Sequence, residues 1–232
     1  MADPTDFVVL FDVDDTLLDN DRVQADLSEH LARTYGASAR ERYWAIFEQL
    51  RAEIGYADYL GALERYRLEA LHDPHILQMA NWLADYPFAD RLYPGALDAV
   101  RRARQWGRPV ILSDGDAVFQ PRKIERSGLW RAFEGRVLIY VHKERELADV
   151  ERWHPAGRYA LIDDKLRILA AVKRIWGDRV TTIFVKQGHY ALDAAALTDL
   201  PPADVEIDRI ADLAHWRPSV GGDASAGKGE RW

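Results

Sequence analysis

The sequence predicts an α/β fold, a doubly wound parallel sheet with an inserted helical unit. After about residue 88, short apolar runs alternate with amphipathic helical patterns, as they do in sheets built from strand-helix-strand units. The long stretch 20–87, by contrast, shows helical periodicity throughout. We therefore expect one core that is divided in sequence by a helical insertion.

The first strand is predicted over Phe7–Phe11, because five consecutive apolar residues suit a strand covered on both faces. The helical insertion that follows contains an apolar stripe, which we interpret as core packing between helices. The stripe consists of Tyr43, Phe47, Leu50 and Ile54.

The rest of the chain is predicted as alternating helices and strands. Strands are expected over 109–112, 137–141, 159–162 and 180–185, and helices over 96–106, 120–128 and 168–176. The expected domains are a core of residues 1–19 and 88–216, a helical cap of 20–87, and a tail of 217–232. We expect the tail to be disordered, because Gly and small polar residues predominate in it.

The composition disfavours several classes of partner and site. The chain has 232 residues and a formal net charge of -7, which argues against a nucleic-acid or anionic-membrane partner. It contains no cysteine, so a metal ligand must be an oxygen or an imidazole nitrogen. We expect a cytoplasmic protein without a membrane span, since neither a basic N-terminal region nor about 18 consecutive apolar residues occur.

Two carboxylates, Asp12 and Asp14, follow the first strand where its apolar run ends. Residues two apart on a strand point to the same side, so both acids can face one site. They repel each other unless a cation or a proton lies between them. This edge of an open α/β sheet is also where ligands bind. An acidic turn that caps the next helix is the alternative interpretation.

Polar residues also follow the later predicted strands. Ser113 follows the second strand, Lys143 the third, and Asp163 with Asp164 the fourth. Each is weak evidence alone, since Ser is common in turns, Lys on surfaces and Asp at helix caps. Because the carboxyl ends of parallel strands meet at one edge of the sheet, the four positions together indicate a single site.

With these four positions the chain resembles the haloacid dehalogenase superfamily. Residues 12–16 resemble its first motif, Asp-x-Asp-x-Thr, while Ser113, Lys143 and the pair Asp163–Asp164 resemble the other three. The resemblance covers about residues 7–185 and places the helical insertion where the family has its C1 cap. It implies a Rossmann-like core and a hydrolase.

The resemblance further implies a Mg²⁺-dependent phosphatase that acts on a small phosphorylated metabolite through an aspartyl-phosphate intermediate. Asp12 would attack phosphorus, and Asp14 would act as general acid and then as general base. The phosphate would be bound by Lys143, by the Ser113 hydroxyl and by backbone N–H groups, including that of Asp114.

The Mg²⁺ ligands implied by the resemblance are all oxygens, which Mg²⁺ prefers. They are the Asp12 carboxylate, the Asp14 backbone carbonyl, and one or both of Asp163 and Asp164. Which of the last two binds directly stays open. Without a cation the site would be a cluster of four acids, so its composition itself predicts metal dependence.

Several alternatives stay open. A phosphomutase or phosphotransferase would pass the same phosphoryl group to another hydroxyl. A 2-haloacid dehalogenase would use Asp12 without a second acid or a metal, and a phosphonatase would need a lysine that 21–85 lacks. A receiver-like signalling domain lacks the cap insertion. A non-catalytic phosphate-binding or regulatory protein would not need the complete set of chemical residues.

Three further expectations concern the surroundings of the site. Lys123 is an alternative to Lys143 as the lysine that binds the phosphate. Because it lies in a predicted helix, we expect its side chain to lie on the surface instead. A specificity loop is expected over 18–24 or 55–59. A homodimer is compatible with the sequence, because helical caps pair in some relatives.

Overall fold

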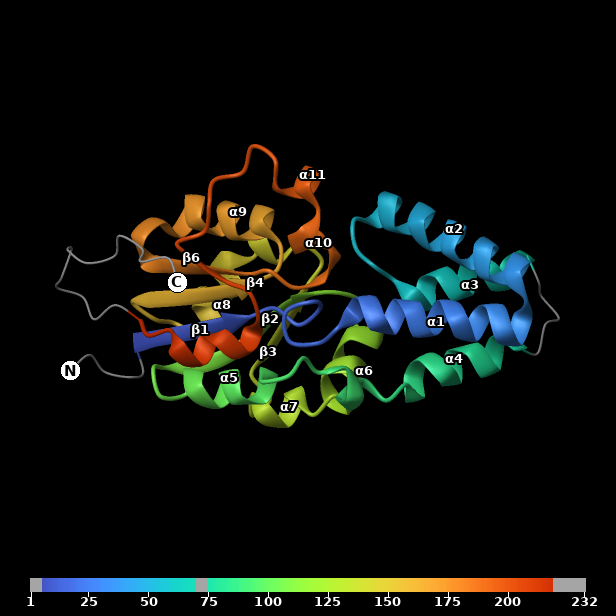
Figure 1. Ribbon diagram of the computed structural model, residues 1–232, viewed down its shortest axis with the longest axis horizontal. Coiled ribbons are helices and arrows are strands. Elements are labelled where there is room, and N and C mark those ends of the chain that lie inside the picture. Colours follow the sequence, from blue (N-terminus) through green and yellow to red (C-terminus); the bar gives the residue numbers. More distant parts are fainter. Residues whose placement is uncertain (1–5, 70–74, 219–232) are drawn as a thin grey trace.

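A computed structural model describes residues 6–69 and 75–218. Six parallel strands form one sheet in the order β3-β2-β1-β4-β5-β6 (Figure 1). The strands are β1 (Phe7–Phe11), β2 (Arg108–Asp114), β3 (Val137–Tyr140), β4 (Arg158–Asp163), β5 (Val180–Val185) and β6 (Val205–Ile207). The predicted doubly wound parallel sheet is confirmed. The short edge strand β6 is additional to the five strands that the sequence predicts.

The central strand β1 is buried on both faces, because helices cover the sheet on either side. Val9 and Phe11 belong to one apolar cluster, whereas Val8 and Leu10 belong to the other. Helices α5 (Ala96–Ala103), α6 (Phe119–Arg126) and α7 (Leu129–Ala132) contribute to the first cluster. Helices α8 (Leu147–Trp153), α9 (Leu166–Trp176) and α10 (Gly188–Leu192) contribute to the second. This covering explains the uninterrupted apolar sequence of β1.

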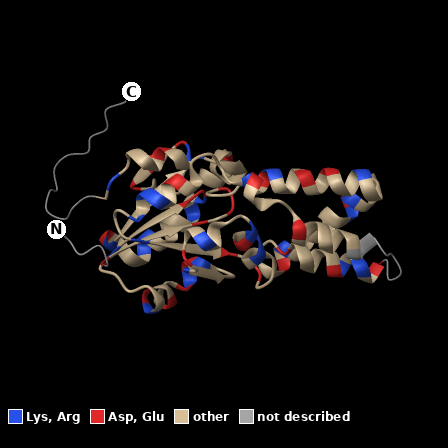
Figure 2. Ribbon diagram, turned by 90° about the horizontal axis from the view of Figure 1, so that it is seen from below, with Lys and Arg blue, Asp and Glu red and all other residues tan. Residues whose placement is uncertain are grey.

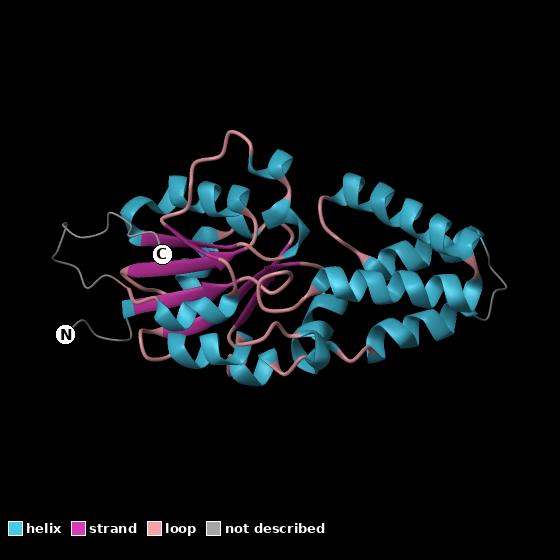
Figure 3. Cartoon of the chain, in the orientation of Figure 1, coloured by secondary structure: helices cyan, strands magenta, loops and turns pink. Residues whose placement is uncertain are grey.

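Four helices lie together beyond the carboxyl ends of the strands, and we call them the helical cap (Figure 3). They are α1 (Asn20–Tyr35), α2 (Ala37–Ile54), α3 (Tyr59–Glu69) and α4 (His75–Asp85). Tyr43, Phe47 and Leu50 of the predicted stripe are buried, while Ile54 is half-buried and packs against the same cluster. The chain enters the cap directly from the loop after β1, so the start of the cap is tied to that loop.

The remaining elements are short. They are α11 (Ala194–Leu197) and the 3₁₀ turns η2 (Phe88–Arg91), η3 (Lys143–Arg145), η4 (Gly177–Arg179) and η5 (Ile210–His215). Figure 2 shows acidic and basic residues interspersed along the cap helices. Within the described residues, no helix combines the length and the apolar character that crossing a membrane requires. From residue 219 onward, the predicted disordered tail lies outside the described residues.

Candidate active site

The residues expected at the strand ends meet at the carboxyl edge of the sheet. Asp12 directly follows β1, Ser113 ends β2 with Asp114, and Asp163 ends β4. The backbone N–H of Asp12 donates to the Ile162 carbonyl at 2.9 Å, which continues the β1–β4 pairing past the end of β1. Residues far apart in sequence therefore share one site because their strands are neighbours.

We call Asp12, Lys143, Asp163 and Asp164 the site floor. The Lys143 Nζ atom lies 2.6 Å from Asp12 Oδ1 and 2.6 Å from Asp163 Oδ2. These side chains are 1%, 3% and 0% exposed, respectively. Burial opposes the charge on Lys143, but Asp12 and Asp163 outweigh it and raise the pKa of the ammonium group. Lys143 is thus a buried cation that joins two carboxylates.

The site floor has the donor set of a divalent-cation site. Asp12, Asp163 and Asp164 each place a carboxylate oxygen within 4.8 Å of the other two. Among the described residues, no donor hydrogen-bonds to Asp12 Oδ2 or to either carboxylate oxygen of Asp164. Burial raises the pKa of Asp163 and, more strongly, that of Asp164, as expected for acids crowded together away from water. A cation held by these oxygens would relieve both effects, so the residues fit a metal ion.

Asp14 takes part in a second set of polar contacts, which links the core to the cap. Its Oδ1 atom is 2.7 Å from Lys123 Nζ, and its Oδ2 atom accepts a 3.3 Å hydrogen bond from Gln120 Nε2. Lys123 also donates to Asn20 Oδ1 at 3.1 Å, and the Asn20 amide donates to the Tyr59 hydroxyl at 3.3 Å. We call these five residues the cap-facing network, since it runs from the core loop into α1 and α3.

The surface position expected for Lys123 is wrong. Its side chain is 1% exposed, on the face of α6 that also carries the buried Phe119. The Lys123 Nζ atom lies 5.5 Å from the centre of the Phe119 ring and 5.9 Å from that of Tyr59. An amphipathic stem packed on aromatic rings with its charge paired to a carboxylate accounts for this burial.

Ser113 and Asp114 lie between the site floor and the cap-facing network. The Ser113 hydroxyl accepts a 3.0 Å hydrogen bond from Gln120 Nε2, so Gln120 contacts both Ser113 and Asp14. The Asp114 carboxylate accepts from the backbone N–H of Lys143 at 2.8 Å. Burial raises the pKa of Asp114. The contact from Asp114 positions the turn that carries Lys143.

Asp15 and Asp19 share the capping role that the alternative interpretation gave to this acidic turn. Asp19 is the N-cap residue of α1, and its side chain accepts from the backbone N–H of Arg22 at 2.8 Å. The Asp15 Oδ1 atom accepts from the backbone N–H groups of Asn20 at 2.9 Å and Asp21 at 3.1 Å, at the start of α1. Asp15 has a left-handed backbone with φ of 59°. Burial and the neighbouring acids Asp21 and Asp14 raise its pKa to about 7. Capping thus applies to Asp15, whereas Asp12 and Asp14 belong to the polar site.

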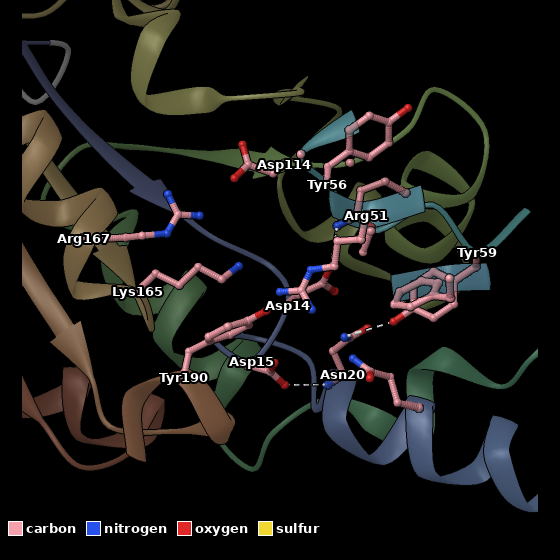
Figure 4. Close-up of a pocket in the computed structure, with 16 residues that line it drawn as sticks. Asp14, Asp15, Asn20, Arg51, Tyr56, Tyr59, Asp114, Lys165, Arg167 and Tyr190 are labelled. Carbon is pink, nitrogen blue, oxygen red and sulfur yellow. Dashed lines mark hydrogen bonds between the residues drawn. The ribbon is translucent and has the colours of Figure 1, made fainter. Parts of the chain in front are cut away.

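A cavity of about 170 Å³ lies between the core and the cap, over this site (Figure 4). Asp14, Asp15 and Asp114 line it from the core, and the loop that contains Tyr56 lines it from the cap. Both segments expected to hold a specificity loop contribute residues, namely Asn20 and Gln24 from 18–24 and four residues of 55–59. Asp12 is not a lining residue, and it is buried.

The sequence reasoning missed Gln120, Asn20 and Tyr59. None of them stands at a strand end, and their polar groups meet only through the packing of α6 against the cap. One signal was available for α6: Phe119 and Lys123 are four residues apart, so they share one face of a helix. A buried aromatic residue on that face predicts that the lysine is buried as well.

Comparison with known proteins identifies related hydrolases. The family model described as haloacid dehalogenase-like hydrolase matches residues 8–162. A protein from Burkholderia xenovorans LB400, described as belonging to the same class of hydrolases, is 60% identical, with a TM-score of 0.87. The match covers 90% of this chain and 95% of that one. A search of curated proteins found no match.

Two more distant solved structures share the fold. L-2-haloacid dehalogenase from Xanthobacter autotrophicus, with chloropropionic acid covalently bound, is 18% identical, with a TM-score of 0.60. A HAD-hydrolase from Bacillus subtilis bound to magnesium is 19% identical, with a TM-score of 0.59. In both cases the match covers 90% of this chain and 96% of the other. The same fold therefore occurs in a dehalogenase and in a magnesium-bound hydrolase.

Proposed function

Because this chain belongs to the haloacid dehalogenase-like hydrolases, we propose that it is a Mg²⁺-dependent phosphatase that hydrolyses a small phosphate monoester. The observation that carries this proposal is a second acid, Asp14, at the cavity, beside the buried carboxylates of Asp12, Asp163 and Asp164. Phosphate esters need a proton for the leaving oxygen and positive charge for the phosphoryl group. A second acid and a cation site supply those two requirements.

In the first step, a carboxylate oxygen of Asp12 attacks phosphorus while the bond from phosphorus to the leaving oxygen breaks. Asp14 gives its proton to that oxygen, so the leaving group departs as an alcohol. Lys143 fixes Asp12 Oδ1 at 2.6 Å and thereby orients the nucleophile. The product on the enzyme is an aspartyl phosphate. The Ser113 hydroxyl and the backbone N–H of Asp114 would donate to the phosphoryl oxygens.

In the second step, water attacks phosphorus and the bond from phosphorus to the Asp12 oxygen breaks, while Asp14, now a carboxylate, takes a proton from that water. Inorganic phosphate is released. Asp12 is regenerated as a free carboxylate, and Asp14 is again protonated. The residues that would hold Mg²⁺ are Asp12, Asp163 or Asp164, and the backbone carbonyl of Asp14. When bound, Mg²⁺ would supply positive charge against the phosphate oxygens.

The fold also occurs in 2-haloacid dehalogenases, which form the alternative. Halide leaves without a proton, so that reaction does not need Asp14 as a general acid. Without a bound metal ion, Lys143 and the nearby Lys165 would have to balance three buried carboxylates, those of Asp12, Asp163 and Asp164. These two features favour phosphoryl transfer over dehalogenation. A phosphomutase would share the first step and differ only in the acceptor.

The test is hydrolysis of 4-nitrophenyl phosphate and of 2-chloropropionate by the wild type, each with Mg²⁺ and with EDTA. We expect hydrolysis of the phosphate only, abolished by EDTA and by Asp12→Asn. Asp178→Asn, an exposed acid before β5, is the matched control and should retain full activity. Chloride release in EDTA, or full phosphatase activity in Asp12→Asn, would overturn the proposal.

A further inference from the structure

Two arginines from different parts of the fold line the same cavity. Arg51 is on α2 of the cap, and Arg167 is in the first turn of α9, just after the acids of the site floor. Figure 4 shows the two guanidinium groups extending toward the cavity from opposite sides. An arginine presents five N–H donors in a planar fork that matches carboxylate and phosphate oxygens. The cavity therefore combines two such forks.

Neither arginine has a close acidic partner within the described part of the chain. Arg167 forms no ion pair or hydrogen bond there and is exposed at the cavity wall. Arg51 has one ion pair, with Glu48 at 3.6 Å, and the Glu48 side chain is 62% exposed. A contact that long with a solvated acid contributes little. Most of the donor capacity of both guanidinium groups is thus available to a ligand.

The acids that line the cavity are, by contrast, already hydrogen-bonded within the protein. Asp14 is held by Lys123 and Gln120, and Asp15 by the backbone at the start of α1. Asp114 accepts from the backbone N–H of Lys143. The two arginines are therefore not there to neutralise these three carboxylates.

Tyr190 holds Arg51 against the core. The Arg51 Cζ atom lies 5.6 Å from the centre of the Tyr190 ring, and Lys165 Nζ lies 5.1 Å from it. Burial disfavours the charge of Lys165, but Asp164, Asp12 and Asp163 outweigh it and raise its pKa. Lys165 also lines the cavity, so it adds a third positive charge beside the two arginines. Arg51 thus packs over the Tyr190 ring, and most of its donors stay available to a ligand.

We propose that Arg51 and Arg167 form a second anion site, which binds an acidic group on the leaving group of the substrate. This inference rests on the proposed phosphatase function and specifies its substrate class: a phosphate monoester whose alcohol carries a carboxylate or a further phosphate. The transferred phosphoryl group must lie against Asp12, which does not line the cavity. The cavity and its two arginines therefore face the leaving group of the substrate. The net charge of -7 repels such a substrate on average, so positive charge at the site is needed to bind it, and the two arginines supply part of that charge in the cavity.

The test compares phenyl phosphate with 3-carboxyphenyl phosphate and 1,3-phenylene bisphosphate. These ligands differ only in the second acidic group, and the two acidic arms distinguish a carboxylate from a phosphate. Binding is measured by calorimetry with Mg²⁺ on Asp12→Asn, which binds without turnover, and kcat/KM is measured on the wild type. We expect at least one acidic ligand to bind about tenfold tighter than phenyl phosphate, with kcat/KM higher by a similar factor.

Substitutions test whether the two arginines cause the tighter binding of the acidic ligands. Arg51→Gln and Arg167→Gln should each remove most of it, lowering the affinity for the acidic ligand much more than that for phenyl phosphate. Arg174→Gln, on the exposed face of the same helix α9, is the matched control and should keep the preference. Arg51→Lys and Arg167→Lys retain the positive charge, so they should keep part of the preference for the acidic ligands.

The outcomes separate the two proposals. If no phosphate ester is hydrolysed, the phosphatase function is wrong, whatever the calorimetry shows. If esters are hydrolysed but neither acidic ligand binds tighter than phenyl phosphate, the anion site is wrong and the phosphatase stands. An equal loss of affinity for all three ligands in the Gln variants would also overturn the anion site, because it would show a structural role only.

Discussion

The site floor and the cap-facing network lie side by side but are built differently. Asp12, Asp163 and Asp164 each end or directly follow a strand of the sheet, Lys143 begins the turn η3 shortly after β3, and all four are buried. The cap-facing network takes its residues from the loop after β1, from α6 and from two cap helices. The nucleophile is therefore oriented by the core alone. The proposed proton carrier, Asp14, depends on contacts that cross into the cap.

The largest expected effect is on the site floor, from Lys143→Met. Removing the ammonium group leaves Asp12 and Asp163 buried without their shared cation. Breaking a buried ion pair from one side costs about 3–5 kcal/mol. We expect a loss of that size in the free energy of unfolding in EDTA, measured by urea denaturation, together with loss of phosphatase activity.

Lys173→Met is the matched control for that prediction. Lys173 pairs with Asp204 at 2.8 Å, but both side chains are more than one-third exposed, at 35% and 37%. Its loss should cost about 1 kcal/mol or less. Equal destabilisation by the two substitutions would contradict the account of Lys143 as a buried cation between two acids.

Asp164→Asn tests whether the site floor is built for a cation. Both Asp164 carboxylate oxygens are buried and lack hydrogen-bond donors among the described residues. Replacing the acid with a neutral amide should therefore stabilise the metal-free protein or leave its stability unchanged. In the wild type, Mg²⁺ at 100 times its Kd should add about 2.7 kcal/mol to the free energy of unfolding. We expect the variant to lose most of that gain, as measured by urea denaturation with and without Mg²⁺.

The sequence predicts which residues form the site floor because the topology of the sheet fixes where the strands end. Parallel neighbours bring their carboxyl ends to one edge, so Asp12, Lys143 and Asp163 had to meet once the strands were correct. The topology of the sheet does not fix the positions of the residues in the cap-facing network. Whether Lys123 reaches Asp14 depends on how α6 packs against the cap, which helical periodicity does not specify. Strand β6 was missed because it has only three residues, two half-buried ones around the exposed Glu206, which are too few to give a pattern.

Lys123→Met tests the cap-facing network. If Lys123 positions Asp14 for proton donation, its loss should matter most when the leaving group needs a proton. We expect kcat/KM to fall about 10- to 100-fold for ethyl phosphate and much less for 4-nitrophenyl phosphate, whose leaving group departs as a stable anion. The measurement is the ratio of kcat/KM for the two substrates in wild type and variant. An equal fall for both would indicate that Lys123 only supports the fold.

Asp15 joins the two regions, because it follows Asp14 directly and its carboxylate accepts hydrogen bonds from the backbone at the start of α1. Its pKa is raised from 3.8 to about 7, chiefly by burial, so the folded protein binds a proton at this carboxyl group that the unfolded chain has lost. The stability it contributes is fully present below about pH 4 and is lost as the pH rises to about 7. Asp15→Asn cannot titrate and can keep both the left-handed backbone and the cap. Between pH 5 and pH 8 the variant should therefore gain about 1–3 kcal/mol relative to the wild type in urea denaturation. A constant difference between the two proteins across that range would mean that Asp15 stays ionised in the folded protein, and that the start of the cap is indifferent to its charge.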